Sequence, residues 1–527
     1  MALISSTRRR AAGLVLALLV ACSPALAQQP QQTPATARAC DVRVTLLMVN
    51  DVYQFVPVDR GAAGGLARVS TLRKRILRES PNTLFLMAGD TISPSVESIT
   101  YKGAQMIDAW NEVGLDYAVF GNHEFDFGPD VLRQRVAESK FTWLGASVFD
   151  AKTGKTFADT PPFVVRDIGG VRVGLFGIVL PETKTTSSPG PDVTFRDSCA
   201  TAREVIPQLR ARGANTIVAL THLSIREDKA LARCAPEIDI IIGGHEHTLH
   251  ESLVGRTPIF KMTSDGREMG QIDLNVNSAT GKVESIDWKI IPVNSAVEDD
   301  PAFASINAKY GAKLKELAEP VGATAVELDA RSATNRTRET NIADYIADAF
   351  RKATGADAAL VNGGSIRADT VITPGPLTLR DVLTILPFGN ELVKLEVKGS
   401  TLRAAIEHGL SRSREDSEPG RFPQVSGIRY TFDATLPAGS RVKSITVGGL
   451  PLDERKTYTL ALAAYLAGGG DQYAMFKGSP NLLKEKLKDS DGLRRVLAEA
   501  GTIAPQTDGR IVRLDSPATE TPCTVAR

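Results

Sequence analysis

The histidines of this chain are few and unevenly placed. Five of the six lie between residues 123 and 250, and four of these come just after short apolar segments that are typical of buried strands. Earlier in the same region, Asp and Asn residues occupy the same kind of position. The whole set comprises Asp51, Asp90, Asn122, His123, His222, His245 and His247. Carboxylate and amide oxygens together with imidazoles suit Zn, Mn, Fe or Co, so these blocks predict a metal centre of that class.

An alternation of apolar and amphipathic segments would position these residues. Strands are predicted at residues 42–49, 83–88, 117–120, 171–179, 216–220 and 238–242. Helices are predicted between several of them, for example at residues 66–77 and 104–113. The alternation predicts a layered α/β domain over residues 40–298. Functional sites in open α/β folds lie at the carboxyl ends of strands. The Asp, Asn and His residues named above follow the predicted strands at these ends.

A boundary is predicted near residue 300. Asp300 can cap a helix that has Pro301 at its first position, and apolar residues then recur at helical spacing up to residue 317. Pro320 and Gly322 would end it, so we predict a linker helix over residues 299–320. A second α/β region follows over residues 321–515, with its first helix from near Asn341 to Gly355, and residues 516–527 form a polar tail.

The first 27 residues have the pattern of an export signal. Three Arg precede an apolar run at residues 11–21, and Ala25-Leu26-Ala27 offers a small-residue cleavage site. The run is too short to span a bilayer, and residues 28–39 read as a flexible leader. Leu19-Val20-Ala21-Cys22 also resembles a lipoprotein box. The sequence therefore leaves a free and a Cys22-anchored protein open, in either case periplasmic or at the cell surface.

Charge and cysteine content narrow the class further. The net charge of the 527 residues is +1, and it becomes −2 without residues 1–27, which carry three Arg and no acidic residue. A nucleic-acid partner is therefore not expected. Four cysteines remain besides Cys22, and an even number in an exported chain suggests two disulfides. Of the three pairings, we expect Cys199–Cys234 and Cys40–Cys523; free buried thiols are the alternative.

In their order along the chain, the strand-end blocks resemble those of the calcineurin-like metallophosphoesterases. More closely, the chain resembles the exported 5′-nucleotidase/UDP-sugar hydrolase family, over roughly residues 42–514. The blocks are Asn50-Asp51-Val52-Tyr53, Gly89-Asp90, Gly121-Asn122-His123-Glu124-Phe125-Asp126, Thr221-His222 and Gly243-Gly244-His245-Glu246-His247. The resemblance implies a four-layered α/β/β/α metallophosphoesterase domain, a linker helix and a C-terminal α/β substrate-binding domain.

The resemblance also implies two metal ions with assigned ligands. One ion would be held by Asp51, Asp90 and His247. Asp90 would bridge to the second ion, which Asn122, His222 and His245 would also hold. His123 would not bind metal but would stabilise the transition state or protonate the leaving oxygen, with Asp126 as its orienting carboxylate.

Tyr53 departs from the family pattern, which usually has His two residues after the first Asp. The phenolic oxygen either coordinates the first metal, which would favour iron, or only packs nearby. Because Tyr is longer than His and the turn after Asp51 is short, we expect that Tyr53 does not coordinate. The substitution Tyr53→His would then raise metal affinity.

Blocks in the second half resemble the family's C-terminal nucleotidase domain, in the same order. Phe388 and Tyr465 match the aromatic pair that sandwiches the base, and Asp471 matches a carboxylate that binds the ribose. Arg367, with Arg336 or Arg338, can form a fork on phosphate. The expected substrate-binding residues are Arg336, Arg338, Asn362, Arg367, Phe388, Asn390, Tyr465 and Asp471.

The expected function is an exported two-metal phosphohydrolase that converts nucleoside 5′-monophosphates to nucleoside and phosphate. Action on UDP-sugars or 2′,3′-cyclic nucleotides is the alternative within the family. A nucleotide-binding protein that has lost catalysis is the alternative from another class, suggested by Tyr53 alone.

Overall fold

The computed structural model describes residues 41–311, 317–413 and 419–515. The predicted signal peptide and leader, Cys22, Cys40, Cys523 and the predicted tail lie outside this range, so the predicted Cys40–Cys523 pairing does as well. Among the described residues, none of the helices has both the length and the apolar character needed to cross a bilayer.

Two six-stranded mixed sheets form the first domain. The first sheet has the order β14 (Val283–Pro292), β13 (Glu268–Asn277), β1 (Asp41–Val49), β2 (Thr83–Met87), β3 (Tyr117–Val119), β4 (Thr142–Leu144). The second has the order β11 (His250–Val254), β12 (Thr257–Lys261), β10 (Ile240–Gly243), β9 (Thr216–His222), β7 (Val171–Val179), β6 (Phe163–Ile168). All six strands predicted from the sequence form here. Strands β1 to β4 are mutually parallel, as are β7, β9, β10 and β12.

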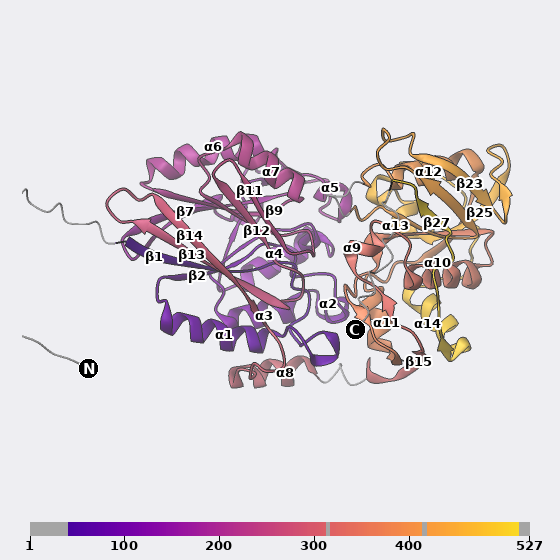
Figure 1. Cartoon of the computed structure of the whole chain (residues 1–527), viewed down its shortest axis with the longest axis horizontal. Coiled ribbons are helices and arrows are strands. Elements are labelled where there is room, and N and C mark those ends of the chain that lie inside the picture. Colours follow the sequence, from indigo (N-terminus) through magenta and orange to yellow (C-terminus); the bar gives the residue numbers. More distant parts are fainter. Residues whose placement is uncertain (1–40, 312–316, 414–418, 516–527) are drawn as a thin grey trace, which may run out of the picture. The chain divides into compact units, whose positions relative to one another are not determined.

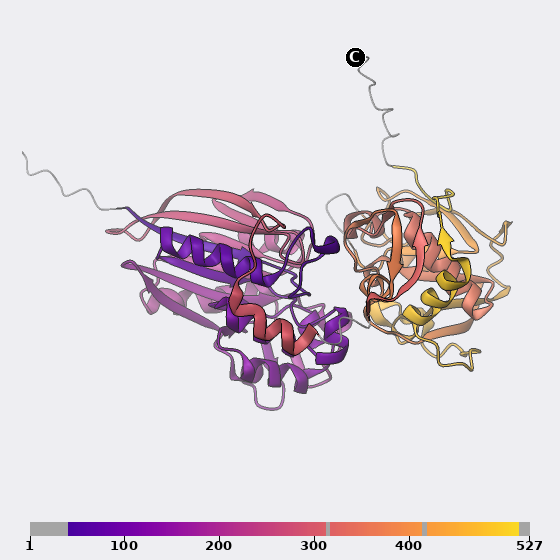
Figure 2. The same ribbon diagram turned by 90° about the horizontal axis from the view of Figure 1, so that it is seen from below.

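Helices cover the outer faces of both sheets, which confirms the expected four layers. Figure 1 shows α1 and α3 on one side of the sheets and α6 and α7 on the other, and Figure 2 gives the same domain from below. The helices of this domain are α1 (Leu66–Glu79), α2 (Val96–Tyr101), α3 (Ala104–Val113), α4 (Pro129–Glu138), α5 (Thr183–Thr186), α6 (Ser198–Ala211) and α7 (Ile225–Cys234). A two-stranded ribbon joins β5 (Val148–Asp150) to β8 (Val193–Phe195).

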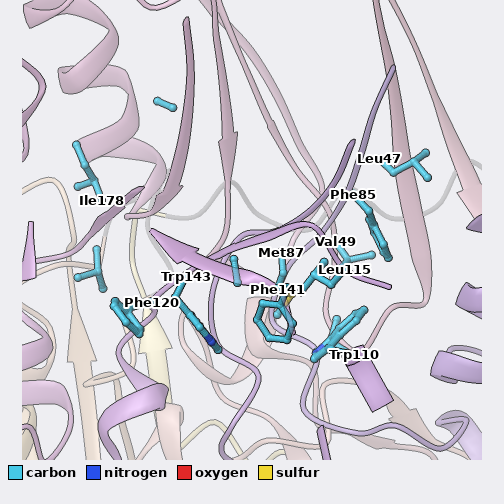
Figure 3. Packing of buried hydrophobic residues seen from close by; sticks show 14 of the residues in the cluster. Leu47, Val49, Phe85, Met87, Trp110, Leu115, Phe120, Phe141, Trp143 and Ile178 are labelled. Atoms are coloured by element: carbon cyan, nitrogen blue, oxygen red, sulfur yellow. The ribbon is translucent and has the colours of Figure 1, made fainter. Parts of the chain in front are cut away.

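The alternation along each strand explains the layers. Leu46 and Met48 of β1 belong to the apolar cluster that fills the space between the sheets. Leu47 and Val49 belong to the cluster that the helices cover. Successive side chains of a strand point to opposite faces, so every second residue serves each layer. Figure 3 shows part of the helix-side cluster, in which the rings of Phe120 and Trp143 stack with centroids 5.1 Å apart.

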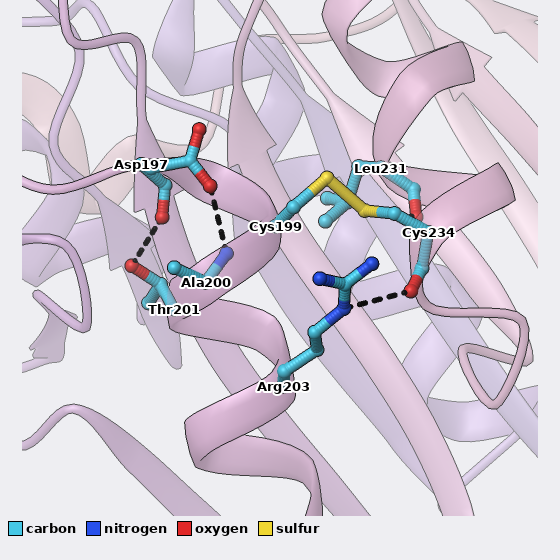
Figure 4. Close-up of a disulfide and its surroundings, with 7 residues drawn as sticks. All are labelled: Asp197, Cys199, Ala200, Thr201, Arg203, Leu231 and Cys234. Atoms are coloured by element: carbon cyan, nitrogen blue, oxygen red, sulfur yellow. Dashed lines mark hydrogen bonds between the residues drawn. A yellow bond between two sulfur atoms is a disulfide. The ribbon is translucent and has the colours of Figure 1, made fainter.

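A disulfide joins two helices on the outer face of the second sheet. Cys199 of α6 and Cys234 of α7 are bonded, which confirms this predicted pair (Figure 4). Arg203 of α6 also donates to the Cys234 carbonyl, at 3.4 Å. The bridge closes a loop in which β9 lies, so it restricts the unfolded chain around the strand that ends at His222.

The predicted linker helix begins as expected. The Asp300 side chain accepts from Ala302 N, with Pro301 at the first helical position, and a 3-10 turn (Pro301–Phe303) leads into α8 (Ala304–Gly311). Residues 312–316 lie outside the description. Pro320 does not end the helix but begins β15 (Pro320–Thr324), because its fixed φ also suits the start of a strand.

The second domain is an α/β unit with several small sheets. Their strand orders are β19–β15–β26, β16–β18, β20–β25–β17–β21 and β24–β23–β22–β27. The bounds are β16 (Leu328–Asp329), β17 (Ala358–Asn362), β18 (Val371–Ile372), β19 (Gly375–Thr378), β20 (Leu392–Lys398), β21 (Pro423–Ser426), β22 (Ile428–Phe432), β23 (Val442–Val447), β24 (Leu450–Pro451), β25 (Thr457–Ala463), β26 (Thr502–Ile503) and β27 (Ile511–Arg513). Its helices are α9 (Ser332–Asn335), α10 (Asn341–Thr354), α11 (Leu379–Ile385), α12 (Gly399–Gly409), α13 (Ala464–Ala467) and α14 (Asp489–Ala500). Thr340 caps α10, and Gly355 ends it in the left-handed conformation, where the sequence predicted the stop.

Candidate active site

Tight turns at the ends of β1 and β2 hold the two central carboxylates. Asp51 has φ +53° and Asp90 has φ +60°, a left-handed backbone that Asp tolerates better than most residues. Both side chains are buried. Small residues make room for them: a Cβ on Gly121 would lie 2.1 Å from Asp90 Oδ1. Strained backbone of this kind concentrates at functional sites.

One half of the cluster surrounds Asp90. His222 Nδ1 donates to the Ala88 carbonyl at 2.8 Å, and Nε2 of the same ring lies 3.1 Å from Asp90 Oδ2. Within the described residues, the buried Asn122 Oδ1 has no hydrogen-bond partner. The His245 ring lies 5.2 Å from the His222 ring, centroid to centroid. An amide oxygen without a partner, together with two imidazoles beside a buried carboxylate, fits a bound cation.

The electrostatics of this half also fit a cation. Burial alone would lower the pKa of His222, but the carboxylates of Asp90 and Asp51 raise it to about 10. The site therefore attracts positive charge. Burial and the neighbouring His222 lower the pKa of His245 to about 3, so His245 is a neutral imidazole and can act as a ligand.

The other half surrounds Asp51. Its Oδ2 accepts from Asn50 Nδ2 at 2.8 Å and from the His245 backbone N at 2.9 Å. His247 Nε2 lies 3.4 Å from Asp51 Oδ1. Asp51, Asp90 and His222 each offer a ligand atom, and these atoms all lie within 4.8 Å of one another. The structure thus brings Asp51, Asp90, His222, His245 and His247 together, and Asn122 lines the same cavity as Asp90, His245 and His247.

Tyr53 reaches into this half. Its hydroxyl oxygen lies 3.1 Å from Asp51 Oδ1, 3.4 Å from Asp90 Oδ2 and 3.0 Å from His247 Nε2. Arg367 donates to the same oxygen at 2.6 Å. Burial raises the pKa of the Tyr53 hydroxyl well above its usual value, and Arg367 opposes this only in part. The length of Tyr, on which we based the expectation that it does not coordinate, therefore does not keep it from the ligands.

His123 lies at the edge of the cluster and pairs with Asp126 as the sequence predicts. Its Nδ1 is 2.8 Å from Asp126 Oδ2, and Ser187 fixes the other carboxylate oxygen at 2.7 Å. Its backbone N donates to Asp90 Oδ1 at 2.8 Å. The imidazole is therefore oriented by a carboxylate, while only its backbone touches a metal ligand.

Glu124 is a functional neighbour that the sequence analysis missed. Its buried carboxylate accepts from the backbone N of Asp90, Thr91 and Gly121, and so ties the turn after β2 to the turn after β3. Burial and the charge of Asp90 raise its pKa to about 7. Its place inside the Gly121 to Asp126 block was the available signal.

A cavity of about 340 Å³ opens beside the cluster. From the first domain it is lined by Asp90, Asn122, His123, Asp126, His245 and His247, among others. Seven of the eight expected substrate-binding residues also line it: Arg336, Asn362, Arg367, Phe388, Asn390, Tyr465 and Asp471. Arg338 is the exception, because its side chain is exposed and does not line the cavity. Arg412 and Arg421 line it as well and were not predicted.

The polar residues of the second domain form a connected set in this cavity. Tyr465 donates to Asp471 Oδ1 at 3.0 Å, and Asn362 Nδ2 donates to Asp471 Oδ2 at 2.8 Å. The Phe388 ring lies 5.7 Å from the His123 ring at an interplanar angle of 28°. One aromatic ring of the second domain therefore lies directly beside the expected acid of the first. His408 Nε2 lies 2.8 Å from the Asp471 carbonyl oxygen, outside the metal cluster.

Comparisons with known proteins cover nearly all of the described chain. Residues 44–249 match the calcineurin-like phosphoesterase family, and residues 320–478 match the 5′-nucleotidase C-terminal domain family. The crystal structure of a 5′-nucleotidase precursor from Thermus thermophilus superposes with a TM-score of 0.84 and 30% identity, over 90% of this chain and 100% of that chain.

Curated relatives agree with this. A snake venom 5′-nucleotidase from Naja atra is 29% identical, over 89% of this chain and 98% of its own length. The trifunctional nucleotide phosphoesterase protein of Bacillus subtilis is also 29% identical, over 89% of this chain, although the match spans only 35% of that longer protein. This chain therefore belongs to the 5′-nucleotidase family, in which a calcineurin-like phosphoesterase domain precedes a 5′-nucleotidase C-terminal domain.

Proposed function

We propose that this chain hydrolyses nucleoside 5′-monophosphates to nucleoside and phosphate. Its family makes it a metal-dependent phosphoric ester hydrolase acting on nucleotides. The observation that carries the finer proposal is the shared cavity, in which four of the expected metal ligands, four arginines and the aromatic side chains of Phe388 and Tyr465 line one space. A nucleotide would match this lining, because its phosphate can bind the cations and its base can stack on the aromatic rings.

The cluster would hold two ions. Asp90 would bridge them, with Asp51, His247 and Tyr53 on one side and Asn122, His222 and His245 on the other. Such ions would supply charge stabilisation for the phosphoryl oxygens and would lower the pKa of an attacking water. Mixed oxygen and nitrogen donors admit Zn, Mn, Fe or Co. The hydroxyl position of Tyr53, 3.0–3.4 Å from three ligand atoms, supports its inclusion.

The remaining side chains would orient the substrate and move one proton. Arg336 and Arg367 present guanidinium groups that can bind the phosphate. His123, held by Asp126, would stabilise the transition state or donate a proton to the leaving ribose oxygen. Phe388 and Tyr465 would stack on the base, and Asp471 would accept from the ribose hydroxyls. Asn362 supports Asp471, and Asn390 would contact the nucleoside.

Replacing an aromatic platform residue tests the nucleotide part of this proposal. Phe388→Ala or Tyr465→Ala should raise the KM for AMP about 5- to 150-fold, since stacking contributes ~1–3 kcal/mol per base. Steady-state kinetics on AMP and on a small aryl phosphate, which needs no platform, should separate the two roles. An equal loss on both substrates, or none on either, would show that these rings are only core residues. Wild-type turnover on UDP-glucose and 2′,3′-cyclic AMP distinguishes the alternatives within the family.

Tyr53 provides a second prediction, about the first metal. If its oxygen is a ligand, Tyr53→Phe should lower the affinity for one of the two ions at least about tenfold. Removing a residue that only supports a ligand already costs about that much, and removing a ligand should cost more. Tyr53→His supplies the imidazole usual in the family and should keep both ions. Calorimetric titration of metal-stripped protein measures both variants. Unchanged affinities in Tyr53→Phe would return Tyr53 to the packing role that we first expected. A visible charge-transfer band that disappears in Tyr53→Phe would in addition identify ferric iron.

We expect the protein to act after export, in the periplasm or at the cell surface. This rests on residues 1–27 and leaves anchoring through Cys22 as the alternative to a free protein. Its partners would be nucleotides or other small phosphate esters.

A further inference from the structure

Asp369 of the second domain touches an expected metal ligand of the first. Its Oδ2 accepts from His247 Nδ1 at 2.8 Å. The Asp369 side chain is only 10% exposed, and its backbone is left-handed, with φ +50°. Asp369 lies two residues after Arg367, whose guanidinium contacts the Tyr53 hydroxyl. A single short segment of the second domain therefore reaches the side of the cluster formed by Asp51, Tyr53 and His247.

The Asp369 carboxylate is held on both oxygens. Ser264 Oγ donates to Oδ2 at 2.8 Å, and the Ser332 backbone N donates to Oδ1 at 2.7 Å. Ser264 belongs to the first domain and Ser332 to the second. The carboxylate thus has a fixed direction, and its position depends on both domains.

This contact determines what the His247 ring can offer to a cation. With Nδ1 donating to a carboxylate, the Nε2 lone pair is left on the side that faces Asp51 Oδ1 and the Tyr53 hydroxyl, at 3.4 Å and 3.0 Å. Carboxylates that accept from the far nitrogen of a ligating imidazole fix its tautomer and orientation and make it a stronger ligand. His222 has a backbone carbonyl in that position instead, from its own domain.

We propose that Asp369 is a positioning residue for His247, so that the second domain raises the metal affinity of the site formed by Asp51, Tyr53 and His247. The inference rests on the two-metal centre of the proposed function. Among the described residues, the contacts of His222 include no such contribution from the second domain. Because linkage is reciprocal, an ion at the first site should in turn favour the contact between the domains at Asp369.

The test is a titration of metal-stripped full-length protein with Mn²⁺ or Zn²⁺ by calorimetry, without substrate. Wild type should bind two ions per chain. Asp369→Asn and Asp369→Ala should bind one ion with wild-type affinity and the other about 10- to 100-fold more weakly. A purely structural role would lower both affinities, or neither, so the split between the sites is the decisive result.

Arg60→Gln is the matched control. Arg60 is exposed and joins the domains by donating to Thr373 Oγ1 at 2.8 Å, away from every expected ligand. The Arg60→Gln variant should leave the affinities for both metal ions unchanged. Melting temperatures should show that all variants fold. Unchanged affinities in both Asp369 variants, or equal losses in Arg60→Gln, would overturn the inference. If the wild type binds two ions but does not hydrolyse AMP, only the proposed function is contradicted. If the wild type binds fewer than two ions, both the proposed function and the inference about Asp369 are overturned.

Discussion

Asp90→Ala should abolish hydrolysis of AMP, and His222→Ala should do the same. Asp90 contacts His222, the Tyr53 hydroxyl and the backbone of His123, so it lies at the centre of the cluster. Its loss removes the carboxylate expected to bridge two cations, and the loss of His222 removes the imidazole whose Nε2 lies 3.1 Å from that carboxylate. Phosphate release should fall to that of a reaction without enzyme, because the charge stabilisation that two metals supply disappears.

Metal content must be measured in the same samples. We expect Asp90→Ala to lose both ions and His222→Ala to lose at least one. Asp287→Ala and His250→Ala are matched controls, because Asp287 is an exposed residue of β14 and His250 begins β11 outside the cluster. A variant that keeps full turnover after losing Asp90 or His222 would show that the chemistry takes place elsewhere.

His123→Ala should reduce kcat by roughly 10²- to 10⁴-fold while leaving the metals bound. The structure separates these two effects. The imidazole contacts Asp126, whereas the link to Asp90 runs through the backbone N, which alanine retains. Asp126→Asn should give a smaller loss of kcat, because the ring keeps its position but loses its charged partner.

Single-turnover kinetics together with metal analysis would check this second prediction. A variant that loses its metals along with its activity would make His123 part of the metal site. A variant with an unchanged kcat would assign the proton transfer to another group, or to none.

The strands of the first domain and the residues expected to be metal ligands could be predicted from the sequence because both leave local signals. Each strand is a run of apolar residues, and each ligand follows such a run directly, as His222 ends β9 and Asp51 follows β1. The carboxyl ends of parallel strands lie at one edge of a sheet, so position along the chain translates into position in space.

The parts that were missed depend on contacts between distant segments. Asp369 meets a residue 122 positions earlier in the chain, and nothing in the spacing of either one shows it. Arg336 and Arg338 lie only two positions apart in the chain, yet Arg336 lines the cavity and Arg338 is exposed. The direction of each side chain depends on the turn that follows α9. The length of Tyr53 did not indicate where its hydroxyl lies, which is 3.1 Å from Asp51 Oδ1.

The most direct test of a two-metal nucleotide hydrolase is AMP turnover by metal-stripped protein during stepwise return of a defined metal. We predict that the stripped protein is inactive and that the release of adenosine and phosphate in equal amounts increases up to two ions per chain. Full AMP hydrolysis by the stripped and chelated protein would contradict a two-metal mechanism.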